Sequence, residues 1–204
     1  QNSLLTVINE KIYRNGQFTV RVPLKALIAA SNELPAKGEG LEALYDRFLI
    51  RQFVGCIEQE YAFDQMISST REIEPEIPEK LQVNDELYNQ VQAESEKVGI
   101  HYTIFELIHN IKREIEQYNT GRDENTPPIY VSDRRWKKIV GLLRTSAYLN
   151  ESPGIHFSDC LLMSACLWDE ISQLPIIEEI VEQSIARGIN TYLLGEKRLE
   201  QKLD

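Results

Sequence analysis

Two side chains near the start of the chain have the types and spacing of a nucleotide-hydrolysis site. Asn32 stands at the end of an apolar run, LKALIAAS, which predicts a buried strand. Ligands of α/β proteins bind at the carboxyl ends of parallel strands, where this amide would lie. Arg47 follows after a loop and a short helix, and its guanidinium suits phosphate oxygens. Together, Asn32 and Arg47 predict half of such a site.

The segments that must position these side chains predict the last strands of an α/β domain. Two apolar runs, Pro23–Ser31 and Phe48–Val54, are predicted as buried strands of a parallel sheet covered on both faces. A β-hairpin is predicted before them, because Asn15–Gly16 lies between alternating residues and suits positive φ. In this hairpin Tyr13 is expected to face Phe18. Short helices are predicted at 1–10, 41–46 and 58–69, and a loop at 33–40.

The second half of the chain predicts a bundle of helices. A charged, proline-bearing stretch, 71–82, is the predicted linker before it. Asn84, Ser132 and Ser158 are expected to cap helices, the last of them apolar and central, and Gly188 is expected to break the final helix. One face of the helix after Ser132 is expected to hold Trp136, Val140, Leu143 and Ala147. The predicted division is an α/β remnant at 1–70, a linker at 71–82, a helical region at 83–188 and the start of a further C-terminal region at 189–204.

Composition narrows the class of protein. The 204 residues carry a net charge of −10, which disfavours nucleic-acid binding through the overall field. No apolar run reaches the roughly 18 residues that a membrane span needs. The three cysteines lie inside apolar runs, which favours a reducing, cytoplasmic location over a disulfide framework. Because the first residues already have helical spacing and lack a Met start, the chain is interpreted as a piece of a longer protein.

Several long blocks of sequence closely resemble the MoxR group of AAA+ ATPases, and within it the RavA subfamily. In chain order, these blocks are LLTVINEKIYRNG, ASNELP, LEALYDRFLIR, QVNDELY and YVSDRRWKKIVGLLRTSA. The resemblance extends to about Glu179. It implies the C-terminal part of a AAA+ module, with the last strands and hairpin of the α/β nucleotide-binding domain followed by a helical-bundle lid.

The resemblance also implies roles for individual side chains. Asn32 matches sensor 1, which orients the attacking water beside the γ-phosphate. Arg47 matches the arginine finger, which acts in trans on ATP bound to the adjacent subunit. Arg134 matches sensor 2 on the lid, with Arg135 as the second choice because the chain has two arginines here. Arg51 is a weaker candidate for a phosphate or interface contact, and otherwise a charge at a strand edge.

For Asn32 and Arg47, interpretations without a role in catalysis also stay open. Asn32 could satisfy backbone groups at the end of a strand. Arg47 could form a surface ion pair with Asp46 or Glu42, worth under about 1 kcal/mol. Zinc is disfavoured, because the histidines are dispersed and the pair His156 and Cys160 has no second pair beside it.

The implied activity is ATP hydrolysis coupled to chaperone-like remodelling of protein complexes. The implied cofactors are ATP and Mg²⁺, and the implied partners are a hexameric ring of identical subunits and a protein with a von Willebrand factor A domain. The chain lacks the GxxxxGK[ST] phosphate loop and a strand ending in Asp-Glu. We therefore expect these 204 residues alone to hydrolyse no ATP and to bind it weakly or not at all.

Two other functions compete with this interpretation. The first is a non-enzymatic helical adaptor that shares ancestry with the lid and leaves Arg47 and Arg134 in surface ion pairs. A phosphate loop encoded upstream in the parent gene would separate it from the ATPase. The second is nucleic-acid translocation through the hairpin, which ranks last because only Lys11 and Arg14 are basic there.

Overall fold

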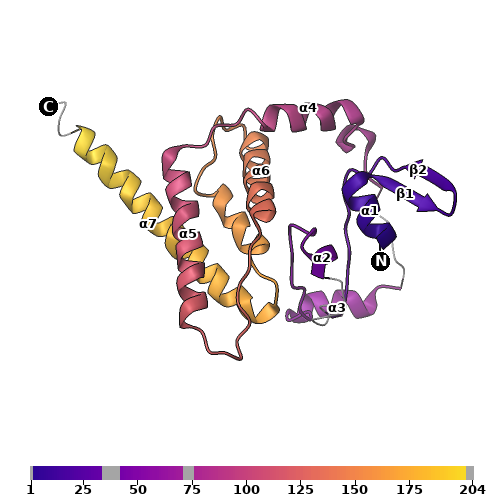
Figure 1. Ribbon diagram of the computed structural model, residues 1–204, viewed down its shortest axis with the longest axis horizontal. Helices are drawn as coiled ribbons and strands as arrows, with labels where there is room; N and C mark the ends of the chain where they lie inside the picture. Colours follow the sequence, from indigo (N-terminus) through magenta and orange to yellow (C-terminus); the bar gives the residue numbers. More distant parts are fainter. Residues whose placement is uncertain (1, 34–41, 71–75, 201–204) are drawn as a thin grey trace.

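Residues 2–33, 42–70 and 76–200 are described by a computed structural model, which is mostly helical (Figure 1). An N-terminal part holds a helix, a hairpin and two further helices, and a bundle of longer helices follows. The N-terminal part contains α1 (Asn2–Glu10), β1 (Ile12–Asn15), β2 (Phe18–Arg21), α2 (Glu42–Tyr45), α3 (Glu60–Ser68) and the 3-10 turn η1 (Glu79–Leu81). The bundle contains α4 (Asp85–Ser95), α5 (Tyr102–Gly121), α6 (Asp133–Leu149), η2 (Asp159–Cys166), η3 (Ile171–Gln173) and α7 (Leu174–Glu200).

The bundle holds the hydrophobic core of the described chain. Helix α5 packs on α7, α4 packs on α6, and η2 contacts both α6 and α7. Each fully buried aliphatic side chain contributes roughly 1.5–3 kcal/mol relative to an exposed one. The largest fully buried apolar side chains are Ile104, Leu107, Ile111, Ile139, Leu143, Met163, Leu167, Ile177 and Val181. The predicted bundle of helices is therefore confirmed.

Two of the predicted caps set the helix starts. The Asn84 side chain accepts a hydrogen bond from Leu87 N at 2.8 Å, and the Ser132 hydroxyl accepts one from Arg135 N at 3.2 Å. Both bonds satisfy backbone donors that the first helical turn leaves without partners. Ser132 therefore fixes where α6 begins, and with it the positions of the two arginines that follow.

The predicted hairpin is present, with a different register. Its turn residues are Gly16 and Gln17, and Gly16 has the positive φ of +59° that favours glycine. The register pairs Tyr13 with Val20 and Asn15 with Phe18. The prediction that Tyr13 faces Phe18 is wrong, because the turn lies one residue later than Asn15–Gly16.

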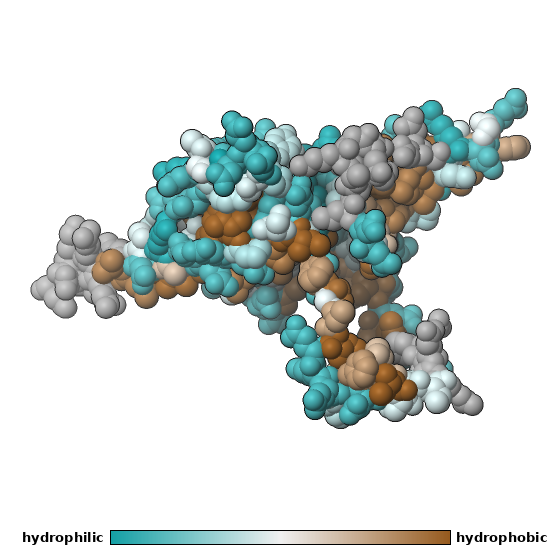
Figure 2. Space-filling model, turned by 90° about the horizontal axis from the view of Figure 1, so that it is seen from below, coloured by the Kyte–Doolittle hydropathy of each residue, from teal (hydrophilic) through white to brown (hydrophobic). Residues whose placement is uncertain are grey.

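The two predicted parallel strands, 23–31 and 48–54, are not formed. The β1–β2 hairpin is the whole of the sheet structure in the described residues, and it is antiparallel. Apolar side chains of the two segments are exposed rather than buried, with Ile28 94% and Val54 81% exposed. A strand is stabilised by neighbouring strands, and the described residues offer neither segment a partner. Figure 2 shows exposed apolar surface in brown on the N-terminal half of the molecule.

The C-terminal helices differ from prediction at Gly188 and at Ser158. Helix α7 runs through Gly188 without a break, so the predicted break is wrong. A Cβ on Gly188 would lie 2.7 Å from Phe157 Cε1, so glycine permits a close packing contact inside the helix. Ser158 has helical backbone angles and makes no capping hydrogen bond, and 159–166 is a 3-10 helix rather than an α-helix. The Asp159 carboxylate instead accepts hydrogen bonds from His156 N and Ser146 Oγ.

Of the predicted domain boundaries, some lie outside the described residues and one lies inside a continuous helix. Residues 71–75 of the predicted linker 71–82, and most of the predicted loop 33–40, lie outside the described residues. Helix α7 continues across the predicted boundary between 188 and 189, and 201–204 lie outside the described residues. Within the described ranges, no helix is both long and apolar enough to cross a membrane.

Candidate functional site

Arg47 lies just after α2, on the segment between α2 and α3 that also contacts the bundle. Its Nε donates a hydrogen bond to Asn9 Oδ1 at 2.7 Å, so the side chain is directed toward α1. The carboxylate of Asp46, which with Glu42 was the alternative ion-pair partner of Arg47, contacts Arg135. The guanidinium is half-buried and keeps the planar set of donors that suits phosphate oxygens.

Asn32 lies in a bend after the irregular segment 22–30, and its side chain is exposed. The neighbouring Ser31 hydroxyl and Glu33 backbone hydrogen-bond each other across this bend. Because no strand forms before it, Asn32 does not lie at the edge of a parallel sheet in this structure. The predicted position of its amide is therefore not reproduced by the described residues.

Arg134 and Arg135 lie side by side in the first turn of α6 but in different environments. Arg134 is exposed at the surface, where its guanidinium could reach a ligand. Arg135 is only 3% exposed. Successive residues of an α-helix point about 100° apart, so one of the two side chains faces the solvent and the other the interior.

Arg135 begins the buried stripe of α6. The buried residues of this helix are Arg135, Ile139, Leu143 and Ala147, spaced by four. Of the predicted face, Leu143 and Ala147 are buried as expected, whereas Trp136 and Val140 are only partly buried and lie one residue after Arg135 and Ile139. The signal was present in the sequence, because extending the four-residue spacing backwards from Ile139 reaches Arg135. Arg135 was instead predicted only as the second choice for sensor 2.

Two arginines and two aspartates meet where the segment after α2 contacts the bundle. We call Asp46, Arg51, Arg135 and Asp169 the Arg–Asp joint. Arg135 Nη2 lies 2.8 Å from Asp46 Oδ1 and 3.0 Å from Asp169 Oδ1, and Arg51 Nη1 lies 2.8 Å from the same Asp169 oxygen. The Asp46 contact is ionic, because Asp46 Oδ1 has no partner of hydrogen-bond geometry among the described residues. Both aspartates are about one-third exposed, whereas both arginines are buried.

Backbone carbonyls complete the surroundings of the joint. Arg51 Nη2 donates to Tyr45 O at 3.1 Å, and Arg51 Nη1 donates to Trp168 O. Arg135 Nη1 donates to Tyr130 O at 3.3 Å. Buried guanidinium groups need such acceptors, since an unpaired buried charge is strongly unfavourable. The interpretation of Arg51 as a charge at a strand edge is therefore wrong.

Opposing effects act on the protonation of Arg51. Burial lowers its pKa most, and the nearby positive charge of Arg135 lowers it further. The negative charges of Asp169 and Asp46 act in the opposite direction. An arginine pKa lies so far above neutrality that the group stays charged at physiological pH. The joint thus holds two positive and two negative charges in a largely buried position.

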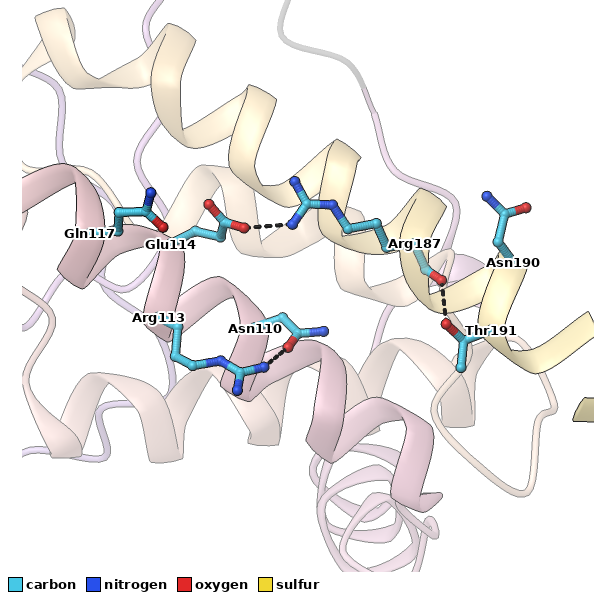
Figure 3. Close-up of a pocket in the computed structure, with 7 residues that line it drawn as sticks. All are labelled: Asn110, Arg113, Glu114, Gln117, Arg187, Asn190 and Thr191. Carbon is cyan, nitrogen blue, oxygen red and sulfur yellow. Dashed lines mark hydrogen bonds and ion pairs between the residues drawn. The ribbon is translucent and has the colours of Figure 1, made fainter. Parts of the chain in front are cut away.

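An open groove lies between α5 and α7, with a volume of about 660 Å³ (Figure 3). Arg187 Nη1 forms an ion pair with Glu114 Oε1 at 2.5 Å, and Arg113 donates a hydrogen bond to the neutral amide of Asn110. Figure 3 shows the Glu114–Arg187 pair joining α5 to α7, whereas Arg113 and Asn110 lie together on α5. None of the predicted site residues lines it.

The described residues fit an ATP site only in part. Arg47 and Arg134 carry guanidinium groups that suit phosphate oxygens, and Asn32 carries an amide. For Mg²⁺ the fit is poor, because no three His, Cys, Asp or Glu side chains gather into a metal site in 2–33, 42–70 or 76–200. Groups for the metal and for most of the triphosphate would have to come from other parts of the protein.

Two family models match the chain in different parts. Residues 1–93 match the MoxR domain found in the MoxR-vWA-beta-propeller ternary systems, and residues 103–181 match the AAA lid domain. The second match begins within α5 and ends within α7, so it spans the helices that pack around η2.

Two proteins of Methanocaldococcus jannaschii are similar to most of the chain. Uncharacterized protein MJ0079 is 34% identical over 180 residues, which is 88% of this chain and 43% of that protein. Uncharacterized protein MJ0812 is 36% identical over 169 residues, which is 83% of this chain and 41% of that protein. The chain thus spans less than half the length of either relative. Together, the MoxR and AAA lid matches support a MoxR-type AAA+ protein.

Proposed function

We propose that this chain is part of a MoxR-type AAA+ ATPase, closest to the RavA subfamily, that couples ATP hydrolysis to the remodelling of protein complexes. One observation carries the proposal. Residues 103–181 match a AAA lid, and the segment bearing Arg47 is held against this lid by the ion pair between Asp46 and Arg135. This contact would hold the segment that bears Arg47 in a fixed position relative to the lid, as an arginine that acts on the nucleotide of the next subunit requires.

Three side chains would contact the nucleotide. When bound, ATP supplies the phosphoryl group that is transferred to water, with Mg²⁺ neutralising its charge. Asn32 would orient the attacking water as sensor 1. Arg134, exposed on α6, would bind the phosphates of the same subunit as sensor 2. Arg47 would act in trans and stabilise negative charge on the transferring group of the next subunit.

The rest of the protein would complete this site. A phosphate loop and the magnesium ligands would come from sequence outside these 204 residues, which alone would be inactive. The exposed apolar segments 23–31 and 48–54 would pair there with further strands and bring Asn32 to a sheet edge. The full chain would also bury side chains such as Ile28, which is 94% exposed here.

An arginine that acts in trans requires an assembly, and we propose a hexameric ring in the cytoplasm. The MoxR domain that matches residues 1–93 is described from MoxR-vWA-beta-propeller ternary systems. We therefore propose a partner with a von Willebrand factor A domain, and a β-propeller protein as a third component. Nucleic acid is a poor partner for a chain with a net charge of −10.

The test uses the full-length protein that contains this chain. Arg47→Ala should lower ATP turnover by about 10³-fold or more, while a fluorescent ATP analogue should bind with unchanged affinity. Arg14→Ala is the matched control, because Arg14 is exposed on the hairpin and, among the described residues, pairs with Glu10 alone at 3.8 Å. Turnover that survives Arg47→Ala would overturn the role of Arg47.

A helical adaptor without enzymatic activity is the second candidate. The observation in its favour is that Arg47 bonds to Asn9 within the same chain, and Arg135 is held in ion pairs. An adaptor needs neither group for chemistry. A full-length protein that neither binds nor hydrolyses ATP would support the adaptor and exclude the ATPase.

A further inference from the structure

Asp46 links the neighbours of two proposed nucleotide contacts. It precedes Arg47 in the sequence, and its carboxylate pairs with Arg135, which follows Arg134. Its other oxygen lies 3.4 Å from the Ser132 hydroxyl, the group that caps α6. The start of α6 and the backbone at Arg47 are thus held at a fixed separation by one carboxylate.

A second connection holds the same segment from its other end. Arg51 N donates to Ala165 O at 2.8 Å, and the Arg51 side chain pairs with Asp169. Asp169 is shared with Arg135, so the two connections meet at one carboxylate oxygen. The stretch from Asp46 to Arg51 is therefore fastened to the bundle at both ends, with Arg47 between them.

Stability alone is a poor explanation for this arrangement. Buried ion pairs often contribute little net stability, because the loss of hydration offsets their attraction. Apolar residues of similar size would seal the same contact at least as well. Charged pairs differ from apolar contacts in fixing direction and spacing, since each guanidinium must meet its carboxylate in one geometry. A geometry-dependent function accounts better for two arginines and two aspartates at one contact.

We propose that the Arg–Asp joint positions Arg47 relative to the lid, so that Arg135 is a positioning residue and not a nucleotide contact. This inference rests on the proposed ATPase function. Through the joint, a movement of α6 that follows phosphate binding by Arg134 would be passed to the segment that carries Arg47. Because Arg47 serves the next subunit, the joint would link nucleotide binding in one site to hydrolysis in the neighbouring site.

The test is Asp46→Asn in the full-length protein, which removes one charge and keeps the shape. We expect kcat for ATP hydrolysis to fall about 10-fold or more, with the affinity for a fluorescent ATP analogue unchanged within about 2-fold, because only the transition-state contact is misplaced. Asp46→Glu, which retains the charge, should recover part of kcat. Glu94→Gln is the matched control: it also converts a carboxylate to an amide, and within the part of the chain that the structure describes the Glu94 side chain pairs with Lys97 alone, at the surface.

Three results would overturn the inference. One is kcat at the wild-type level in Asp46→Asn. Another is a parallel loss of nucleotide affinity and kcat, which a merely structural role would produce. The third is a 10-fold or greater loss of nucleotide affinity in Arg135→Lys, since that would place Arg135 on the nucleotide. If the Asp46→Asn protein does not assemble, Arg51→Lys replaces it in the test. The expected result is the same: a lower kcat with unchanged nucleotide affinity. A wild-type protein without ATPase activity would instead overturn the proposed function.

Discussion

Asp46 and Arg135 form an ion pair of 2.8 Å that joins the segment after α2 to the first turn of α6. The pair is not isolated, because Asp169 and Arg51 extend it into a network of four charges. Its arginines are buried while its carboxylates keep some contact with water. The two arginines at the start of α6 therefore differ in environment. Arg134 is exposed and accessible to a ligand, whereas Arg135 is buried and joins the segment after α2 to the bundle through its ion pairs.

The first prediction concerns how much the side chains of Arg134 and Arg135 contribute to the free energy of unfolding. Arg135→Ala should lower the free energy of unfolding by about 2–4 kcal/mol, because Asp46 and Asp169 lose a buried partner. Arg134→Ala should change it by less than about 0.5 kcal/mol, as exposed positions usually do. Urea denaturation of this chain and the two variants measures the difference. Equal effects would show that the two side chains do not differ in burial.

The second prediction concerns mixed assemblies of the full-length protein. Arg47→Ala and Arg134→Ala should each inactivate a uniform ring. In a random equal mixture about one site in four should be intact, combining Arg134 of one subunit with Arg47 of its neighbour in a head-to-tail ring. ATP turnover of the mixture, compared with each variant alone, measures this recovery. A mixture as inactive as its components would argue against action of Arg47 in trans.

The third prediction concerns the contact between α7 and the loop before η2. Gly188→Ala should destabilise the protein by roughly 1 kcal/mol or more, because its Cβ would lie 2.7 Å from Phe157 Cε1. In a Phe157→Ala background the same change should stabilise, since alanine exceeds glycine in helix propensity by about 1 kcal/mol. Thermal denaturation of the four proteins gives both signs. The same sign in both backgrounds would mean that Phe157 does not require glycine there.

The fourth prediction concerns the cysteines. Burial raises the pKa of Cys160 to about 12 and that of Cys166 to about 11, from an ordinary value of 9.0. A thiol reagent at pH 8 should therefore modify exposed Cys56 in the folded chain and the other two only after unfolding.

The raised pKa values also fix the sign of a pH effect on stability. Both thiols stay protonated in the folded chain while the unfolded chain releases their protons above about pH 9, so the folded state loses stability from there up to about pH 12. Replacing Cys160 and Cys166 by alanine should flatten this decline, measured by urea denaturation between pH 8 and pH 11. An unchanged slope would show that these thiols do not cause it.

The parts of the fold that depend on neighbouring residues could be predicted from the sequence. Asn84 and Ser132 cap helices as expected, since a cap involves only the next three residues. The hairpin was predicted from its Gly16 turn, although the register was off by one step. The strand prediction failed for 23–31, because an apolar run indicates burial but does not supply the strands beside it.

The site depended on contacts that local spacing does not reveal. Asp46 lies 86 residues from Ser132 in the sequence, and Arg51 lies 118 residues from Asp169. No periodicity connects such positions, so the pairing of Asp46 with Arg135 and of Asp169 with Arg51 was not predicted. The exception is Arg135, whose burial follows from the four-residue spacing of the apolar stripe in α6. A charge on a buried stripe predicts an opposite charge nearby, even when the partner cannot be named.

The exposed apolar side chains of the N-terminal half have a practical consequence for anyone who purifies this chain. Ile28, Val54 and Phe18 are each more than three-quarters exposed. Exposed apolar surface of this kind drives self-association and precipitation in water. Handled by itself, the polypeptide should therefore aggregate as its concentration rises. If the proposed function holds, co-expression with the rest of the ATPase should cover this surface and reduce the aggregation.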